Sequence, residues 1–89
     1  MRAVITVIGK DTVGILASVA SECANAGVNV TEVTQSILQD LFAMIMMVDI
    51  SKATIPFREL ADRMQDLGEK RNLKIHVMHE DIFNSMHRI

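Results

Sequence analysis

The sequence predicts an α+β fold whose elements follow the order βαββαβ, with a short helix after the last strand. Short β-branched runs alternate with two segments of helical period in that order along the chain. The 89 residues are 49% hydrophobic and 22% charged, a composition that suits one small globular domain. The crossover rule leaves few other topologies. We therefore expect a ferredoxin-like sandwich, in which two helices cover one face of a four-stranded antiparallel sheet.

The first strand and the first helix are separated by a glycine-bounded loop. Residues 2–8, RAVITVI, are largely β-branched and end at Gly9, which predicts a strand. From Gly14 the apolar residues recur at helical period, and Gly27 is expected to end the helix. Its buried face is predicted to contain Ile15, Leu16, Val19, Ala20, Cys23, Ala26 and Gly27.

Residues 28–51 predict a β-hairpin that turns at the pair Gln39–Asp40. In its first strand the apolar parity changes after Val30, so that Val33 and Ile37 fall on the other side. This phase slip around Thr31–Glu32 predicts a β-bulge, because one extra residue in a strand reverses the direction of every side chain beyond it.

The second half of the chain repeats the alternation. Pro56 marks the start of a second helix, with Thr54 or Ile55 expected at the N-cap. Residues 72–80 alternate as the last strand, and residues 81–89 form an amphipathic C-terminal helix outside a core of residues 1–80. The second helix is predicted to bury a stripe of Phe57, Leu60, Ala61, Met64, Leu67 and Gly68.

The strand at 41–51 is apolar on both faces, although two helices can cover only one face of the sheet. A partner subunit, the C-terminal helix, or the C-terminal helix of a partner must therefore cover the other face. We expect a homodimer or a higher homo-oligomer. One face carries Phe42, Met44, Met46, Val48 and Ile50, and the other carries Leu41, Ala43, Ile45 and Met47.

The loop GKDTVGIL looks like a phosphate loop but lacks its chemistry. A Walker A loop needs Lys and Ser or Thr after its second glycine, and here Ile15 and Leu16 follow Gly14. The first N–H groups of the helix suit a carboxylate, and Asp11 would accept an ammonium group, so the loop fits an amino acid. In the alternative interpretation, Asp11 or Thr12 only caps the helix and Gly14 only permits the turn.

Composition excludes several classes of partner. A formal charge of −2 gives no basic stripe for nucleic acid. No apolar run reaches membrane-spanning length, and the N-terminal segment is too short for a signal peptide. The single cysteine, Cys23, forms no internal disulfide and indicates a reducing, cytoplasmic location.

The sequence contains no set of residues suited to catalysis or to metal binding. His76 and His79 are three apart on a strand and point to opposite faces, and His87 lies in the C-terminal helix. Cys23 falls within the apolar stripe as a small buried hydrophobe. No nucleophile, base and orienting group can be assembled, so we expect no enzyme activity, no metal and no cofactor.

The segments VIGKDTVGIL, ANAGVNVTEVTQSI and LFAMIMMVDI, in this order and spacing, resemble the ACT domain family. The likeness spans residues 1–80 and is greatest to small stand-alone ACT proteins similar to the glycine cleavage system regulator. It implies a regulatory domain that binds an amino acid or similar metabolite between a loop of one domain and the second strand of a neighbour. By position, the loop side is Asp11, Thr12, Val13, Gly14, Ile15 and Leu16, and the strand side is Asn29, Val30 and Thr31.

Two functions remain open from the sequence. In the first, the protein senses an amino-acid-like ligand at a subunit interface, and the ligand stabilises one assembly over another. In the second, it binds no metabolite and docks onto another copy or a partner protein through its apolar sheet face and C-terminal helix.

Overall fold

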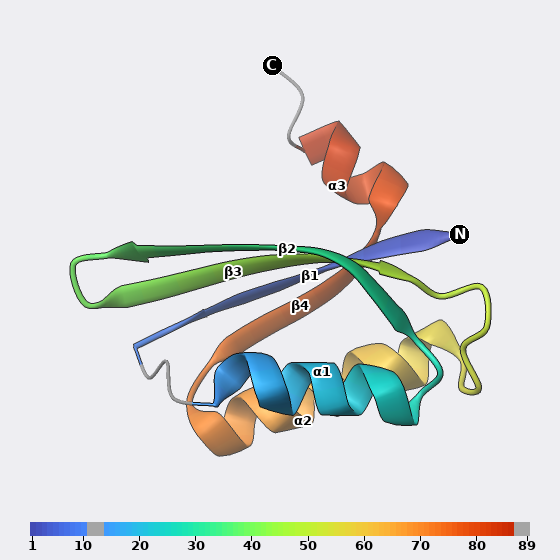
Figure 1. The fold of residues 1–89 in the computed structure, drawn as a ribbon, viewed down its shortest axis with the longest axis horizontal. Helices are drawn as coiled ribbons and strands as arrows, with labels where there is room; N and C mark the ends of the chain where they lie inside the picture. The colour runs from blue at the N-terminus through green and yellow to red at the C-terminus, as the bar shows by residue number, and fades with distance from the viewer. Residues whose placement is uncertain (11–13, 87–89) are drawn as a thin grey trace.

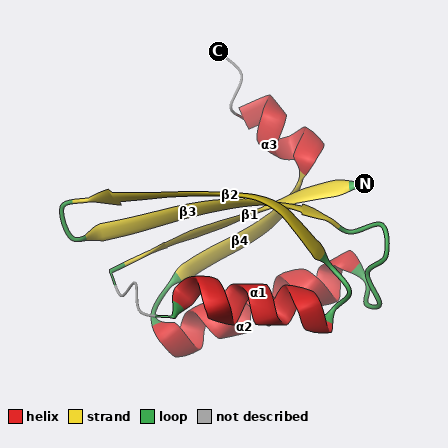
Figure 2. Cartoon of the chain, viewed as in Figure 1, coloured by secondary structure: helices red, strands yellow, loops and turns green. Residues whose placement is uncertain are grey.

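The computed structural model describes residues 1–10 and 14–86. Its sheet has the strand order β2-β3-β1-β4, with every neighbouring pair antiparallel. Two long helices lie on one side of this sheet and a short third helix lies on the other (Figures 1 and 2). The predicted fold is confirmed. The elements are β1 (Arg2–Gly9), α1 (Ile15–Asn25), β2 (Asn29–Leu38), β3 (Leu41–Asp49), α2 (Phe57–Arg71), β4 (Lys74–His79) and α3 (Glu80–Met86).

The predicted bulge is present in β2. Val30 pairs with Val48, but the next pair joins Glu32 to Met47, so Thr31 is the extra residue. The Thr31 hydroxyl donates a 3.0 Å hydrogen bond to the carbonyl oxygen of Met47. The bulge therefore reverses the apolar parity along β2 as the sequence indicated.

The sequence predicted the C-terminal end of α1 correctly but not the N-cap of α2. Gly27 ends α1 as predicted: its φ is 70°, and the following Val28 N–H bonds back to the Cys23 carbonyl oxygen at 2.8 Å. The predicted N-cap of α2 was wrong. Pro56 itself is the N-cap, because its ψ of 152° is extended and its carbonyl accepts the first helical bond, from Leu60 N–H at 3.1 Å.

The hydrophobic core lies between the sheet and the helices α1 and α2. In α1 the buried face is narrower than predicted, since Leu16 is 39% exposed and only one side of the helix meets the sheet. In α2 the positions Phe57, Ala61 and Leu67 are likewise only partly buried. Buried core residues include Ala3, Ile5 and Val7 of β1, Ile15, Val19 and Cys23 of α1, Phe42, Met44, Met46 and Val48 of β3, and Leu60 and Met64 of α2.

The other face of the sheet, which we call the open face, is covered in part by α3. This helix contacts β1 and β4 on that side (Figure 1). Val4 of β1, whose neighbours Ala3 and Ile5 face the core, is fully buried. Beyond the reach of α3, Ile8, Leu41 and Ile45 remain 40–44% exposed. Three large apolar side chains are thus left facing solvent on a strand pair at the centre of the sheet.

Within the described part of the chain, no helix is both long enough and apolar enough to cross a membrane.

Candidate ligand site

The loop side of the predicted site lies where the chain leaves β1 and enters α1. Asp11, Thr12 and Val13 fall outside the described residues. Gly14 is the N-cap of α1, with φ 70° and ψ 8°, and it has no side chain with which to cap the helix. Its carbonyl accepts the first helical bond, from Ser18 N–H at 3.0 Å. A residue in this left-handed conformation is strained unless it is glycine.

Arg71 brings a positive charge to this end of α1. Its guanidinium donates a 2.7 Å hydrogen bond from Nη1 to Ser18 Oγ. A Cβ atom built on Gly14 would lie 3.7–3.8 Å from the two terminal guanidinium nitrogens. Sequence reasoning missed Arg71, because α2 ends far along the chain from the loop and only the fold brings the two together.

The other loop residues contribute differently. The Ile15 side chain is 1% exposed and packs in the core, so only its backbone is available to a ligand. The Leu16 side chain is 39% exposed on the outer face of α1. Of these two loop-side residues, Ile15 therefore offers a ligand only backbone atoms, and Leu16 also offers an exposed side chain.

The strand side of the predicted site lies at the start of β2. Asn29 is exposed and pairs with Asp49 at the end of β3. Val30 is partly buried against the core, and Thr31 occupies the bulge, where its hydroxyl bonds to Met47. Only Asn29 therefore offers an uncommitted polar side chain at this point among the three predicted strand residues.

The structure does not bring the two sides together within one copy. Asn29 lies in register with Asp49 and Arg2, whereas the loop follows Gly9 at the opposite end of β1. The 8 residues of β1 span roughly 25 Å. A single copy cannot close a small ligand between its own loop and its own Asn29.

A hollow of about 330 Å³ lies beside Asn29. The Asp49 carboxylate in it is held by Ser51, whose N–H and hydroxyl donate to Oδ1 at 2.9 and 2.6 Å. These two bonds are the main reason that the pKa of Asp49 lies below its ordinary value, and the N-terminal ammonium and Lys52 lower it further. The hollow is lined by Gly27, Asn29, Asp49, Ser51 and Lys52.

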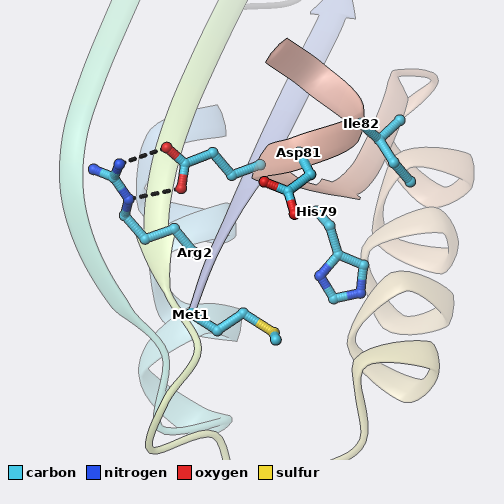
Figure 3. Close-up of a pocket in the computed structure, with 6 residues that line it drawn as sticks. Met1, Arg2, His79, Asp81 and Ile82 are labelled. Carbon is cyan, nitrogen blue, oxygen red and sulfur yellow. Dashed lines mark hydrogen bonds and ion pairs between the residues drawn. The ribbon is translucent and has the colours of Figure 1, made fainter. Parts of the chain in front are cut away.

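A larger hollow, of about 500 Å³, lies where α3 joins the sheet (Figure 3). Arg2 closes one wall through a bidentate ion pair with Glu80, including a 2.9 Å bond from Nε to Oε2. His79 forms another wall, and its ring stacks on Phe57 with the ring centroids 4.1 Å apart. The Arg2–Glu80 pair ties the start of α3 to β1, and the His79–Phe57 stack ties the end of β4 to α2.

The remaining reactive side chains do not converge. His76 pairs with Thr6 on the open face and His79 pairs with Ala3 on the helix-covered face, so the two imidazoles point apart as expected. Within residues 1–10 and 14–86, no three His, Cys, Asp or Glu side chains are placed to hold a metal ion. Cys23 is fully buried in the core, and its burial raises the pKa of the thiol to about 11.

Comparison with known proteins identifies the class of domain that this fold represents. The model of the ACT domain family matches residues 2–78, and the chain belongs to that family. This confirms the resemblance drawn from the loop, the Val-Asn-Val segment and the methionine-rich strand.

Relatives of similar length share the whole chain. A UPF0237 protein of Listeria innocua is 46% identical over 89 residues, which is all of both chains. A UPF0237 protein of Methanocaldococcus jannaschii is 43% identical over 88 residues, covering 99% of this chain and 98% of the relative.

Solved structures show the same architecture. An ACT domain protein from Streptococcus pneumoniae superimposes with a TM-score of 0.81 at 35% identity, covering 93% of each chain. The regulatory subunit of aspartate kinase from Thermus thermophilus, in its ligand-free form, gives a TM-score of 0.64 at 21% identity over 85% of this chain and 49% of its own. At that identity the second likeness concerns the fold alone.

Proposed function

We propose that this protein is a cytoplasmic regulatory module that binds an amino acid or a similar small metabolite at an interface between its own copies. The observation that carries the proposal is the end of α1, where Gly14 leaves the first N–H groups of the helix uncapped by its own side chain. The guanidinium of Arg71 lies beside the same helix end. Two sources of positive potential at one point favour a carboxylate.

The second side of the site is supplied by another copy of the chain. β2 is an edge strand, and two β2 strands paired antiparallel about a two-fold axis would run in opposite directions. Ile37 pairs with Phe42, which in turn pairs with Gly9, so this end of the sheet is the loop end. Antiparallel pairing would therefore bring Asn29 of the second copy to the loop end of the first copy's sheet.

The composition of β2 favours such pairing. From Glu32 to Ile37 every residue is exposed, and Glu32 is the only charged residue among them. Val33 is 38% exposed and Ile37 66% exposed on the helix-covered face. A long edge strand without lysine or proline has an open row of backbone donors and acceptors, which favours addition of another strand.

A thermal-shift screen of the pure protein against free amino acids tests the proposal. A ligand at a hundredfold excess over its dissociation constant stabilises the folded state by roughly 2.7 kcal/mol, a shift of many degrees for a domain of this size. The shift should vanish in Gly14→Val, because a β-branched residue strains the left-handed turn and fills the space before α1. A flat screen of the wild-type protein would reject the sensor function.

A second candidate function is a ligand-free assembly module, favoured by the exposed Ile8, Leu41 and Ile45 on the open face. In this case a second copy packs on that face and α3 forms the rim. Removing residues 81–89 should then weaken assembly more than Gly14→Val does. Size-exclusion chromatography with light scattering distinguishes the two functions. If neither change alters assembly or ligand response, both candidates are wrong.

A further inference from the structure

The open face of the sheet is covered by α3 at one end only. This helix stands above the end where β1 begins and β4 finishes, and among the described elements it contacts neither β2 nor β3 (Figure 1). The 8 residues of β1 span roughly 25 Å, whereas a helix with its side chains is about 10 Å wide. One helix therefore leaves room for a second one at the loop end of the same face.

The uncovered loop end of this face is apolar. Ile8, Leu41 and Ile45 are 40–44% exposed there. Leu41 and Ile45 flank Ala43 on the same side of β3, and Ala43 pairs with Ile8. The three exposed side chains thus form one patch, which we call the loop-end patch, and a further apolar surface would remove it from water.

The helix α3 carries an apolar side chain that its own sheet does not cover. Ile82 is 52% exposed, and Figure 3 shows it pointing away from Arg2. Within one copy, Ile82 and the loop-end patch lie at opposite ends of the open face. A single chain therefore cannot bring these two apolar surfaces together.

The two ends of the open face also carry opposite charges that one copy leaves without an ion pair. At the α3 end, Glu80 is paired with Arg2, and the adjacent Asp81 is exposed. At the loop end, the exposed Lys74 pairs in register with Ile8. Within residues 1–10 and 14–86, neither Asp81 nor Lys74 forms a salt bridge. Each end of the face thus joins an exposed apolar side chain to one charge, and the two charges are complementary.

We propose that α3 of one copy packs on the loop-end patch of another copy. Ile82 covers Ile8 and Ile45, and the carboxylate of Asp81 lies beside the ammonium of Lys74. The contact is reciprocal, because a two-fold axis that runs across the strands between two facing sheets places the α3 end of each copy over the loop end of the other. Each open face is then covered by its own α3 at one end and by the second copy's α3 at the other.

This contact uses a part of the chain outside the common core of the family. The ACT model matches residues 2–78, and α3 begins at Glu80. The surface on α3 is therefore a feature of this chain in addition to the ACT domain.

The inference rests on the proposed function, because its unit is the edge-paired dimer. Antiparallel pairing of β2 about a two-fold axis perpendicular to the sheet leaves both open faces on the same side of one continuous sheet. Two such dimers stack through two facing pairs of copies, and contacts made together hold more strongly than each one alone. The product is a tetramer, and loss of edge pairing weakens the stacking as well.

The test is charge reversal in the full chain, with Asp81→Lys, Lys74→Glu and an equal mixture of the two. Either variant alone places like charges at every α3 contact, which should raise the dissociation constant for stacking about tenfold or more and leave dimers. In the mixture, a dimer of one variant meets a dimer of the other, every contact again joins opposite charges, and the tetramer should return. Asp62→Lys, on the exposed side of α2, is the matched control and should assemble as wild type. Sedimentation velocity gives the mass of each form.

Recovery on mixing distinguishes a contact between copies from damage to α3, because a helix disrupted by Asp81→Lys would not be rescued by a second variant. Tetramers in both single variants, or dimers that persist in the mixture, would overturn the α3 contact. Wild-type dimers that are stabilised by free amino acids would also overturn it and would leave the sensor function standing. A wild-type protein that stays monomeric at every concentration, with and without amino acids, would overturn both.

Discussion

Arg71, in the last turn of α2, donates a 2.7 Å hydrogen bond to Ser18 Oγ in the first turn of α1. The bond ties the two long helices together at the end where the predicted ligand loop enters α1. Arg71 thereby holds its guanidinium beside Gly14, and this position depends on the packing of the two helices.

Ser18→Ala should lower the free energy of unfolding by about 1 kcal/mol, because it removes one partly buried hydrogen bond to a charged donor. Urea denaturation followed by circular dichroism measures this change. Ser21→Ala, on the exposed side of the same helix, is the matched control and should be neutral or slightly stabilising. Equal effects of the two substitutions would show that the Arg71 contact adds nothing to stability.

Two glycines with the same φ of 70° should respond differently to alanine. Gly14→Ala should cost about 1–2 kcal/mol through backbone strain, since the nearest atoms to a Cβ there, in the part of the chain that the structure describes and apart from its chain neighbours, are the Arg71 guanidinium nitrogens at 3.7–3.8 Å. Gly27→Ala should cost about 1–3 kcal/mol more, because its Cβ would also lie 2.7 Å from the Lys52 carbonyl oxygen. Chemical denaturation of both variants checks the order, and a smaller loss in Gly27→Ala would contradict it.

Alkaline pH should destabilise the protein through Cys23. Burial raises the thiol pKa from 9.0 to about 11, so the unfolded chain loses this proton first. The unfolding free energy should therefore fall as the pH rises from 9 toward 11, by up to roughly 2.5 kcal/mol from this group. The chain has no tyrosine, so the other side chains that titrate near this pH are lysines. Cys23→Ala should therefore reduce the fall of the unfolding free energy with pH to the part that the lysines cause. Identical pH profiles for the two proteins would refute the assignment.

Lysine substitutions on the two candidate surfaces should separate edge pairing from packing of the open face. Val33→Lys combined with Gln35→Lys places charge along the β2 edge and should convert the proposed oligomer to monomer. Ile45→Lys places charge on the open face and should leave edge pairing intact. Light scattering gives the mass of each form. The reverse pattern would favour the assembly module over the sensor.

Local patterns predicted much of the fold. The parity change after Val30 located the bulge, and Gly27 marked the end of α1, because both depend on residues close together in sequence. The apolar second face of β3 led to the expectation of a further covering layer; α3 covers part of that face, and Leu41 and Ile45 remain exposed.

The parts that sequence reasoning missed depend on contacts between distant segments. Nothing near Arg71 in the sequence indicates that it reaches Gly14, because that approach needs α1 and α2 to lie on the same face of the sheet. The N-cap of α2 was missed because the extended ψ of Pro56 is set by the turn before the helix.

The central claim is that an amino acid binds between copies and stabilises their assembly. Sedimentation velocity over a dilution series, with and without a mixture of free amino acids, tests it directly. We predict that the mixture lowers the dissociation constant of the oligomer, and that Gly14→Val abolishes the effect while still assembling. A dissociation constant that is the same with and without amino acids would contradict the account.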